Sequence, residues 1–251
     1  MNIKNSLSSI INKLLSKYDM RLSRINRDEI PRFRYVNLIN ELQGAFKEFI
    51  FPELEVSDKR TELITQLWGT GCSESLYIIG CLNNTLNISG DICEFGIAQG
   101  STSALLANEI RNTSKKIWLF DSFKGLPKPT AKDVLLDDIK NLGSIEKYEG
   151  TMSHSIDLVR RKLNNISFPS SRVMIVDGYI EETIKLDNLP NNVCFAYLDF
   201  DFYEPTKIVL EYLNKILSRG GCIVVDDYEY FSSGVKDAVQ EFLTSYPNCY
   251  K

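Results

Sequence analysis

The sequence predicts an α/β protein with one mostly parallel sheet covered by helices on both faces and preceded by a helical extension. From residue 90 onward, short apolar runs alternate with stretches in which apolar residues recur at helical spacing. This alternation is typical of right-handed strand–helix–strand crossovers, which give parallel strands buried on both faces. The length of 251 residues fits one such domain with additions.

The first 36 residues form a basic segment, with eight Lys and Arg and three Asp and Glu side chains. Apolar residues recur at helical spacing between residues 3 and 18, which predicts an amphipathic helix. Such a helix can lie on an anionic membrane surface, or it can pack on the main domain or on a second subunit. We favour the packing interpretation.

The remaining elements follow in order along the chain. Helices are expected at 36–49, 58–68, 72–86, 101–111, 153–163, near 181, 205–217 and 234–243. Strands are expected at 91–96, 116–121, 173–177, 193–199 and 222–227. The segment 124–148 carries glycines, prolines and aspartates and is expected to be an inserted loop or lid. We divide the chain into an N-terminal helical extension, 1–56, and a main domain, 57–251.

Composition excludes several classes of function. The formal net charge is −4, and an acidic chain argues against nucleic acid as a partner. The single histidine, His154, excludes multi-histidine metal sites and argues against Ser–His or Cys–His chemistry. The six cysteines contain no C-x-x-C pair, and we interpret them as reduced thiols. We expect no transmembrane segment and no signal peptide, and therefore a cytoplasmic location.

A glycine-rich loop follows the first expected strand. It runs from Glu94 through Gly96 and Gly100 to Ser101, where a helix is expected to begin. Glycines let a ligand approach the backbone closely, and a helix N-terminus favours negative charge. The loop matches neither G-x-G-x-x-G nor a P-loop, which excludes those pyrophosphate-binding fingerprints.

Acidic residues at the next two strand ends indicate a nucleoside ligand. Asp121 ends the second expected strand, where a carboxylate accepts the ribose hydroxyls, and Asp177 ends the third, where a polar side chain can meet an adenine edge. A nucleoside site without a phosphate-binding loop predicts S-adenosylmethionine as the cofactor.

Four carboxylates follow the last two expected strands. Asp199 and Asp201 come after one strand, and Asp226 and Asp227 come after the next. Converging carboxylates repel one another unless a cation neutralises them or they share protons. An all-oxygen set without histidine selects a hard cation, which is Mg²⁺ or else Mn²⁺ or Ca²⁺.

These motifs resemble the macrocin O-methyltransferase family, metal-dependent enzymes that methylate sugar hydroxyls of macrolides and related antibiotics with S-adenosylmethionine. The resemblance covers roughly 57–245, and its most specific part combines Asp-x-Asp at 199–201 with Asp-Asp-Tyr at 226–228. It implies a Rossmann-like class I methyltransferase fold. It also implies metal ligands at Asp199, Asp226 and Asp227 and a general base at Asp201. The cofactor-binding residues that we assign are Glu94, Gly96, Gly100, Ser101, Asp121, Ser122, Asp177 and Gly178.

The chain departs from the family pattern in three places. The family's Gly-Val-Trp-Arg-Gly-Gly loop is Gly-Ile-Ala-Gln-Gly-Ser at 96–101, which removes contacts from Trp and Arg. Phe200 stands between two aspartates where a small residue is expected. The antiparallel hairpin that usually closes this fold is short or absent before Lys251. We therefore expect an exposed edge strand, or one covered by a partner, and a homo-oligomer.

The sequence thus predicts an enzyme that transfers a methyl group to a hydroxyl of a small sugar-containing or glycan acceptor. One alternative is a catechol-type O-methyltransferase acting on an aromatic diol. Another is a non-catalytic binding or scaffold protein with a degenerate methyltransferase fold. A nicotinamide-dependent oxidoreductase is disfavoured by the missing dinucleotide fingerprint.

Overall fold

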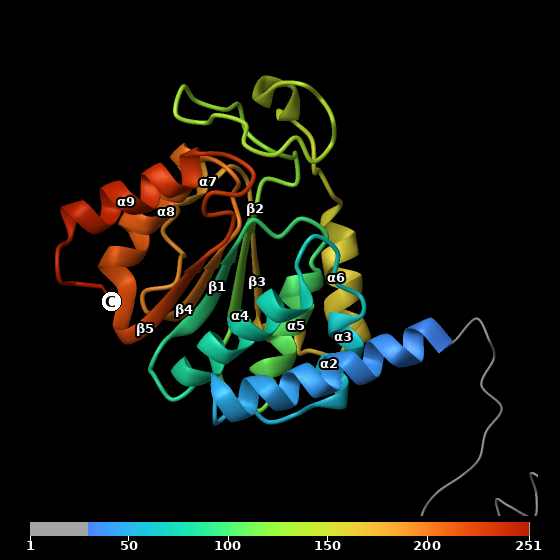
Figure 1. Cartoon of the computed structure of the whole chain (residues 1–251). Coiled ribbons are helices and arrows are strands. Elements are labelled where there is room, and N and C mark those ends of the chain that lie inside the picture. The colour runs from blue at the N-terminus through green and yellow to red at the C-terminus, as the bar shows by residue number, and fades with distance from the viewer. Residues whose placement is uncertain (1–29, 251) are drawn as a thin grey trace, which may run out of the picture.

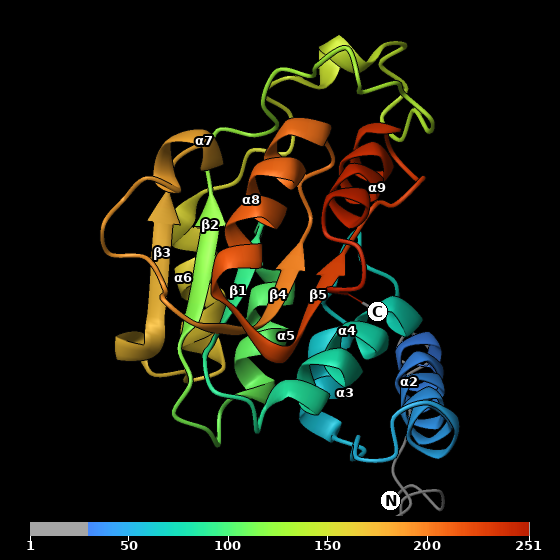
Figure 2. The same ribbon diagram turned by 90° about the vertical axis from the view of Figure 1, so that its left-hand side faces the viewer.

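The computed structural model of the chain describes residues 30–250, so the amphipathic helix expected between residues 3 and 18 lies outside the described part. Five parallel strands form one sheet in the order β3-β2-β1-β4-β5 (Figure 2). The strands are β1 (Asp91–Phe95), β2 (Ile117–Asp121), β3 (Val173–Asp177), β4 (Val193–Leu198) and β5 (Leu217–Val225). The strand order reverses between β1 and β4, which is where ligands bind in open parallel sheets. The predicted fold class is confirmed.

Helices cover both faces of the sheet (Figures 1 and 2). One face carries α4 (Cys72–Thr85), α5 (Ser101–Glu109) and α6 (Ile156–Asn165), and the other carries α7 (Ile180–Thr183), α8 (Tyr203–Ile216) and α9 (Gly234–Ser245). Outside the first layer, α2 (Ile30–Phe49) packs on α3 and α4, and α3 (Asp58–Ile64) packs on α5. Two short 3₁₀ helices, η3 (Ile145–Tyr148) and η4 (Ser170–Arg172), complete the described part.

Alternating side chains of the strands build two apolar cores. In β2, Ile117 and Leu119 face the layer of α4, α5 and α6, whereas Trp118 and Phe120 face α8 and its neighbours. All six residues of β4 are buried. A central strand covered on both faces explains why these segments read as nearly continuous apolar runs.

Several element boundaries differ from the predicted ones. Helix α6 begins at Ile156 because the Ser155 hydroxyl caps it by accepting a hydrogen bond from Asp157 N, so His154 precedes the helix. Helix α8 begins at Tyr203, two residues before Pro205, because a proline in the first turn loses no intrahelical hydrogen bond. Strand β5 follows α8 directly at Leu217, five residues earlier than expected.

A buried ion pair attaches α3 to α5. The Arg60 guanidinium donates to both carboxylate oxygens of Glu109, at 3.0 and 2.6 Å, and its side chain is 5% exposed. Gln43 of α2 also accepts from Arg60, at 2.8 Å. The outer helices therefore share polar as well as apolar contacts with the main domain. The domain boundary between residues 56 and 57 stays a prediction.

Between β2 and α6, residues 122–155 form a lobe above the carboxyl ends of the strands, which we call the loop lobe (Figure 1). It encloses a third apolar cluster, formed by Leu126, Ile145, Tyr148, Phe202 and Phe231. Phe202 follows the predicted base Asp201, so the loop lobe packs beside the predicted site.

Strand β5 lies at the edge of the sheet and pairs only with β4 among the described strands. An edge strand presents unpaired backbone groups. The self-association expected from this edge stays a prediction. Within residues 30–250, no helix combines the length and the apolar composition needed to cross a bilayer.

Candidate active site

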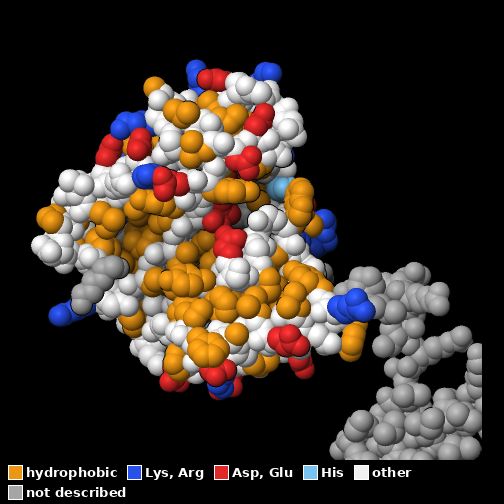
Figure 3. Space-filling model, viewed as in Figure 1, with side chains coloured by type: hydrophobic (Ala, Val, Ile, Leu, Met, Phe, Trp, Pro, Cys, Tyr) orange, Lys and Arg blue, Asp and Glu red, His pale blue; other side chains and the backbone are white. Residues whose placement is uncertain are grey.

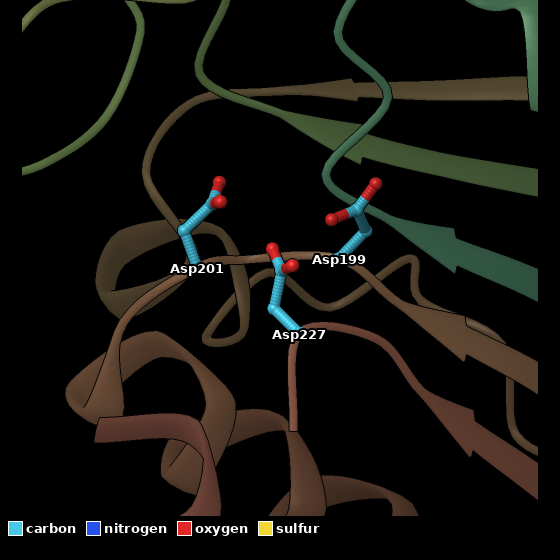
Figure 4. Close-up of side chains that lie close together, drawn as sticks. All are labelled: Asp199, Asp201 and Asp227. Atoms are coloured by element: carbon cyan, nitrogen blue, oxygen red, sulfur yellow. The ribbon is translucent and has the colours of Figure 1, made fainter. Parts of the chain in front are cut away.

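Three carboxylates meet at the carboxyl ends of β4 and β5. Asp199 and Asp201 follow β4, and Asp227 follows β5; one oxygen of each lies within 4.8 Å of the others. All three side chains are half-buried, and they project to the same side of the chain (Figure 4). The sequence predicted each of them as a site residue, and the structure brings them together.

The backbone at Asp201 makes a tight turn. Its φ is +64°, and Phe202 N donates to Phe200 O at 2.7 Å across it. A bond between residues two apart with a positive φ at the centre is a rare, strained γ-turn. Such conformations cost roughly 1–3 kcal/mol and persist where the surroundings hold them. Here the Ser232 hydroxyl donates to Asp201 O at 2.6 Å.

The carboxylates of the cluster perturb one another. Burial, followed by Asp226 and Asp201, raises the pKa of Asp199 well above its ordinary value. Burial and Asp227 raise the pKa of Asp201. Burial also raises the pKa of Asp227, although a hydrogen bond with Asp201 lowers it. Repulsion and desolvation of this kind are relieved by a bound cation or by a shared proton.

Asp226 is oriented differently from its neighbour. Its carboxylate accepts hydrogen bonds from the Tyr197 hydroxyl and, at 2.8 Å, from Asp227 N. Its oxygens fall outside the 4.8 Å group formed by Asp199, Asp201 and Asp227. The ligand role that the resemblance implies for Asp226 stays a prediction.

Glu74, which was not predicted from the sequence as a site residue, lies near Asp226. It lies in the first turn of α4, where it accepts a hydrogen bond from Gly71 N at 2.8 Å. Burial, followed by the neighbouring Asp226, raises the pKa of Glu74 to about 7. A glutamate three residues after an N-cap is a helix-start signal, so the sequence predicts its capping role and not its place beside Asp226.

The glycine-rich loop lies next to the cluster. Gly96 and Gly100 have φ values of +82° and +76°. The Asp121 carboxylate accepts hydrogen bonds from Ile97 N at 2.8 Å, from Ala98 N at 3.1 Å and from Phe123 N at 2.6 Å. Asp121 thus fixes the loop in this structure, and its predicted contact with ribose is an additional role that stays a prediction.

The other predicted cofactor residues occupy the same edge of the sheet. The Ser122 hydroxyl donates to Gly125 O at 3.1 Å, and the Ser101 hydroxyl accepts a hydrogen bond from Lys162. Asp177 is exposed at the end of β3, and Gly178, which follows it, donates to Asp121 O at 3.0 Å. Their contacts with a nucleoside stay predictions.

Glu94 lies beneath the loop and is 1% exposed. Among the described residues, no hydrogen-bond partner reaches its Oε2 or the hydroxyl of Ser103. Burial raises the pKa of Glu94 to about 8; the nearby Ser103 hydroxyl opposes this rise, and Asp121 adds to it. Buried polar atoms without partners are costly, so these two mark where a polar ligand or water fits.

The residues present fit both groups that the sequence predicts. Carboxylate oxygens without histidine or thiolate suit a hard divalent cation. The first-turn N–H groups of α5, the glycine backbone and the unpartnered Glu94 oxygen suit the polar end of a nucleoside cofactor. Figure 3 shows acidic side chains exposed in a hollow below the loop lobe.

Comparison with known proteins decides the family. Residues 80–246 match the macrocin O-methyltransferase (TylF) family. The chain belongs to this family. It is 27% identical over 172 residues to an 8-demethyl-8-(2,3-dimethoxy-α-L-rhamnosyl)-tetracenomycin-C 4′-O-methyltransferase of Streptomyces olivaceus, covering 66% of this chain and 63% of that protein. It is 26% identical over 169 residues to a mycinamicin III 3″-O-methyltransferase of Micromonospora griseorubida, covering 64% of each chain.

Two solved structures share the fold. The O-methyltransferase NovP superposes with a TM-score of 0.63 at 21% identity, over 86% of this chain and 92% of that chain. The calicheamicin methyltransferase CalS11 superposes with a TM-score of 0.57 at 20% identity, over 88% of this chain and 86% of that chain. As a macrocin O-methyltransferase family member, the chain carries its acidic cluster at the carboxyl ends of β4 and β5 of a methyltransferase fold.

Proposed function

We propose that this chain transfers the methyl group of S-adenosylmethionine to a hydroxyl of a sugar or sugar-containing natural product, with Mg²⁺ or another hard divalent cation. The observation that carries the proposal is the convergence of Asp199, Asp201 and Asp227 beside the glycine-rich loop, in a chain of this family. One relative described above is named for 4′-O-methylation of a rhamnosyl-tetracenomycin, and the other is named for 3″-O-methylation of mycinamicin III. The two matches span 63% and 64% of those relatives' lengths, so the acceptor is part of the proposal.

The residues have distinct proposed tasks. Glu94, the glycine backbone and the start of α5 hold the methionine end of the cofactor. Asp121 and Ser122 hold the ribose, and Asp177 and Gly178 lie beside the adenine. Methyl transfer requires the acceptor oxygen, the methyl carbon and the sulfur in line, so positioning by these residues supplies much of the acceleration.

Asp199 and Asp227 belong both to the observed cluster and to the ligand set that the resemblance implies, and we propose that they hold the cation. Asp226 completes the set by turning from its partner Tyr197, and Asp201 accepts the proton of the acceptor hydroxyl. When bound, a divalent cation lowers the pKa of a coordinated hydroxyl. Without a bound cation, burial and Asp227 raise the pKa of Asp201 above its ordinary value.

The direct test is calorimetric titration with S-adenosylmethionine, with and without Mg²⁺, followed by methyl-transfer assays on rhamnosides and on catechol. Asp199→Asn and Asp226→Asn should lose cation binding, whereas Asp201→Asn should keep it and lose turnover. Asp157→Asn is the matched control, because that side chain is 67% exposed on α6. Transfer to catechol in place of sugars favours the aromatic-diol alternative. Absence of cofactor binding by the wild-type chain refutes the methyltransferase proposal and favours the scaffold alternative. A cytoplasmic location and self-association belong to the proposal as expectations.

A further inference from the structure

The loop lobe is tied to the turn that carries Asp201 through one buried carboxylate. Asp133 is 3% exposed. One of its oxygens accepts Tyr203 N at 2.7 Å, and the other accepts the N–H of Thr130 at 2.7 Å and its hydroxyl at 2.8 Å. Tyr203 begins α8 two residues after Asp201. Asp133 therefore fixes the chain on the C-terminal side of the γ-turn.

A second hydrogen bond holds the turn from the segment just before α9. Ser232 is fully buried, and its hydroxyl donates to Asp201 O at 2.6 Å while it accepts from Gly234 N at 3.2 Å. Ser232 also forms an antiparallel bridge with Leu135 of the loop lobe. The loop lobe and the segment before α9 thus meet each other and both hold the turn, Asp133 through Tyr203 N and Ser232 through Asp201 O.

The Asp133 carboxylate is closely packed against Gly234. A β-carbon on Gly234 would lie 1.9 Å from an Asp133 carboxylate oxygen and 2.7 Å from Tyr203 N. A carboxylate also matches the partners, because it accepts on both oxygens, whereas an asparagine would turn an NH₂ donor toward one of the donors. No Lys or Arg among the described residues pairs with Asp133, so its charge is met by these three hydrogen bonds.

We propose that Asp133 is a positioning residue for methyl transfer: it holds the strained turn that aims Asp201, so that the loop lobe sets the geometry of the base. This inference rests on the proposed function. A strained turn persists only while its neighbours determine it, and a catalytic group displaced by about 1 Å loses roughly 100-fold in rate.

The test compares Asp133→Asn with Asp137→Asn, the same chemical change at an exposed position of the same lobe. With the Mg²⁺-loaded full chain, Asp133→Asn should lower kcat for methyl transfer to a rhamnoside about 100-fold. KM for S-adenosylmethionine and the affinity for Mn²⁺ should stay within about twofold, because the binding residues are untouched. The control should match the wild type. A kcat of Asp133→Asn near the control value would overturn the proposal, as would equal losses in kcat and in both binding constants.

A double-mutant cycle separates positioning from general stability. If Asp133 acts through Asp201, Asp133→Asn should add less than about twofold to the loss caused by Asp201→Asn. Multiplicative losses would overturn the proposal.

Hydrogen exchange gives a readout that does not need turnover. Amides at 200–204 should exchange faster in Asp133→Asn than in Asp137→Asn, and equal exchange would overturn the inference. A wild-type chain that transfers no methyl group would refute the proposed function alone, because this readout would still report whether Asp133 holds the turn.

Discussion

Gly96 and Asp199 lie in main-chain contact: a β-carbon on Gly96 would lie 1.9 Å from the carbonyl oxygen of Asp199. The contact arises because β1 and β4 are neighbours and Asp199 N donates to Phe95 O at 2.8 Å at their ends. Gly96 also has a φ of +82°, which L side chains rarely adopt. The loop predicted to bind the cofactor and the acid predicted to bind the cation are thus joined directly.

Gly96→Ala should therefore lower both stability and cofactor affinity. Overpacking and the left-handed backbone together should cost about 3 kcal/mol of unfolding free energy, measured by urea denaturation. Gly44→Ala is the control, because a β-carbon there meets nothing within 4 Å in the interior of α2, and it should gain about 0.5–1 kcal/mol. A Gly96→Ala variant as stable as the wild type would contradict the close contact.

Removing one charge from the acidic cluster should stabilise the metal-free chain. The raised pKa of Asp199 means that its ionised form is disfavoured by folding, so wild-type stability falls as pH rises above about 4, the usual aspartate pKa. Without divalent cation at neutral pH, Asp199→Asn should raise Tm by a few degrees. Saturating Mg²⁺ should raise the Tm of the wild type and leave the variant unchanged. A lower Tm for the metal-free variant would show that the carboxylate is not under strain.

The raised pKa of Glu94 predicts that the stability of the chain depends on pH. Its pKa of about 8 in the fold exceeds its ordinary value of 4.5, so its contribution is complete below pH 4.5 and is lost as pH rises through 8. Between pH 5 and pH 8, the metal-free wild-type chain should lose on the order of 3 kcal/mol more unfolding free energy than the Glu94→Gln variant. Denaturation curves of both proteins across this range give the difference. Parallel pH dependences would show that Glu94 titrates normally.

Removing one partner of the ion pair between Arg60 and Glu109 should cost more stability than replacing both partners with apolar residues. Arg60→Ala leaves a buried carboxylate unpaired and should cost about 3–5 kcal/mol. Changing both residues, as Arg60→Met with Glu109→Leu, should recover most of that loss because no charge stays unpaired. Lys59→Ala serves as the control, since its pair with Glu62 is half-exposed on the same helix. A double variant no more stable than Arg60→Ala would refute this account.

Local pattern was enough to predict the sheet and most of its helices. Apolar runs such as 193–198 are buried on both faces, and Asp199 and Asp227 follow parallel strands whose ends share one edge. Acids placed there lie at the same edge of the sheet, so a site at this edge could be predicted from position alone. Element ends were less certain, because a cap such as Ser155 depends on a single hydrogen bond.

Side-chain direction and long-range contacts needed the tertiary structure. Asp226 and Asp227 are adjacent in sequence, yet only Asp227 joins the cluster while Asp226 bonds with Tyr197. Glu74 and Asp133 reach the site from segments about 150 and 70 residues away in the chain, through the packing of α4 and of the loop lobe.

The sequence by itself therefore determined which strands exist, that their ends carry acids, and which family the motifs resemble. These properties depend on periodicity and on the shared edge of a parallel sheet. Only the tertiary structure decided which carboxylates face one another and which side chains hold the turn at Asp201. Those relationships depend on packing between distant segments, which local periodicity does not encode.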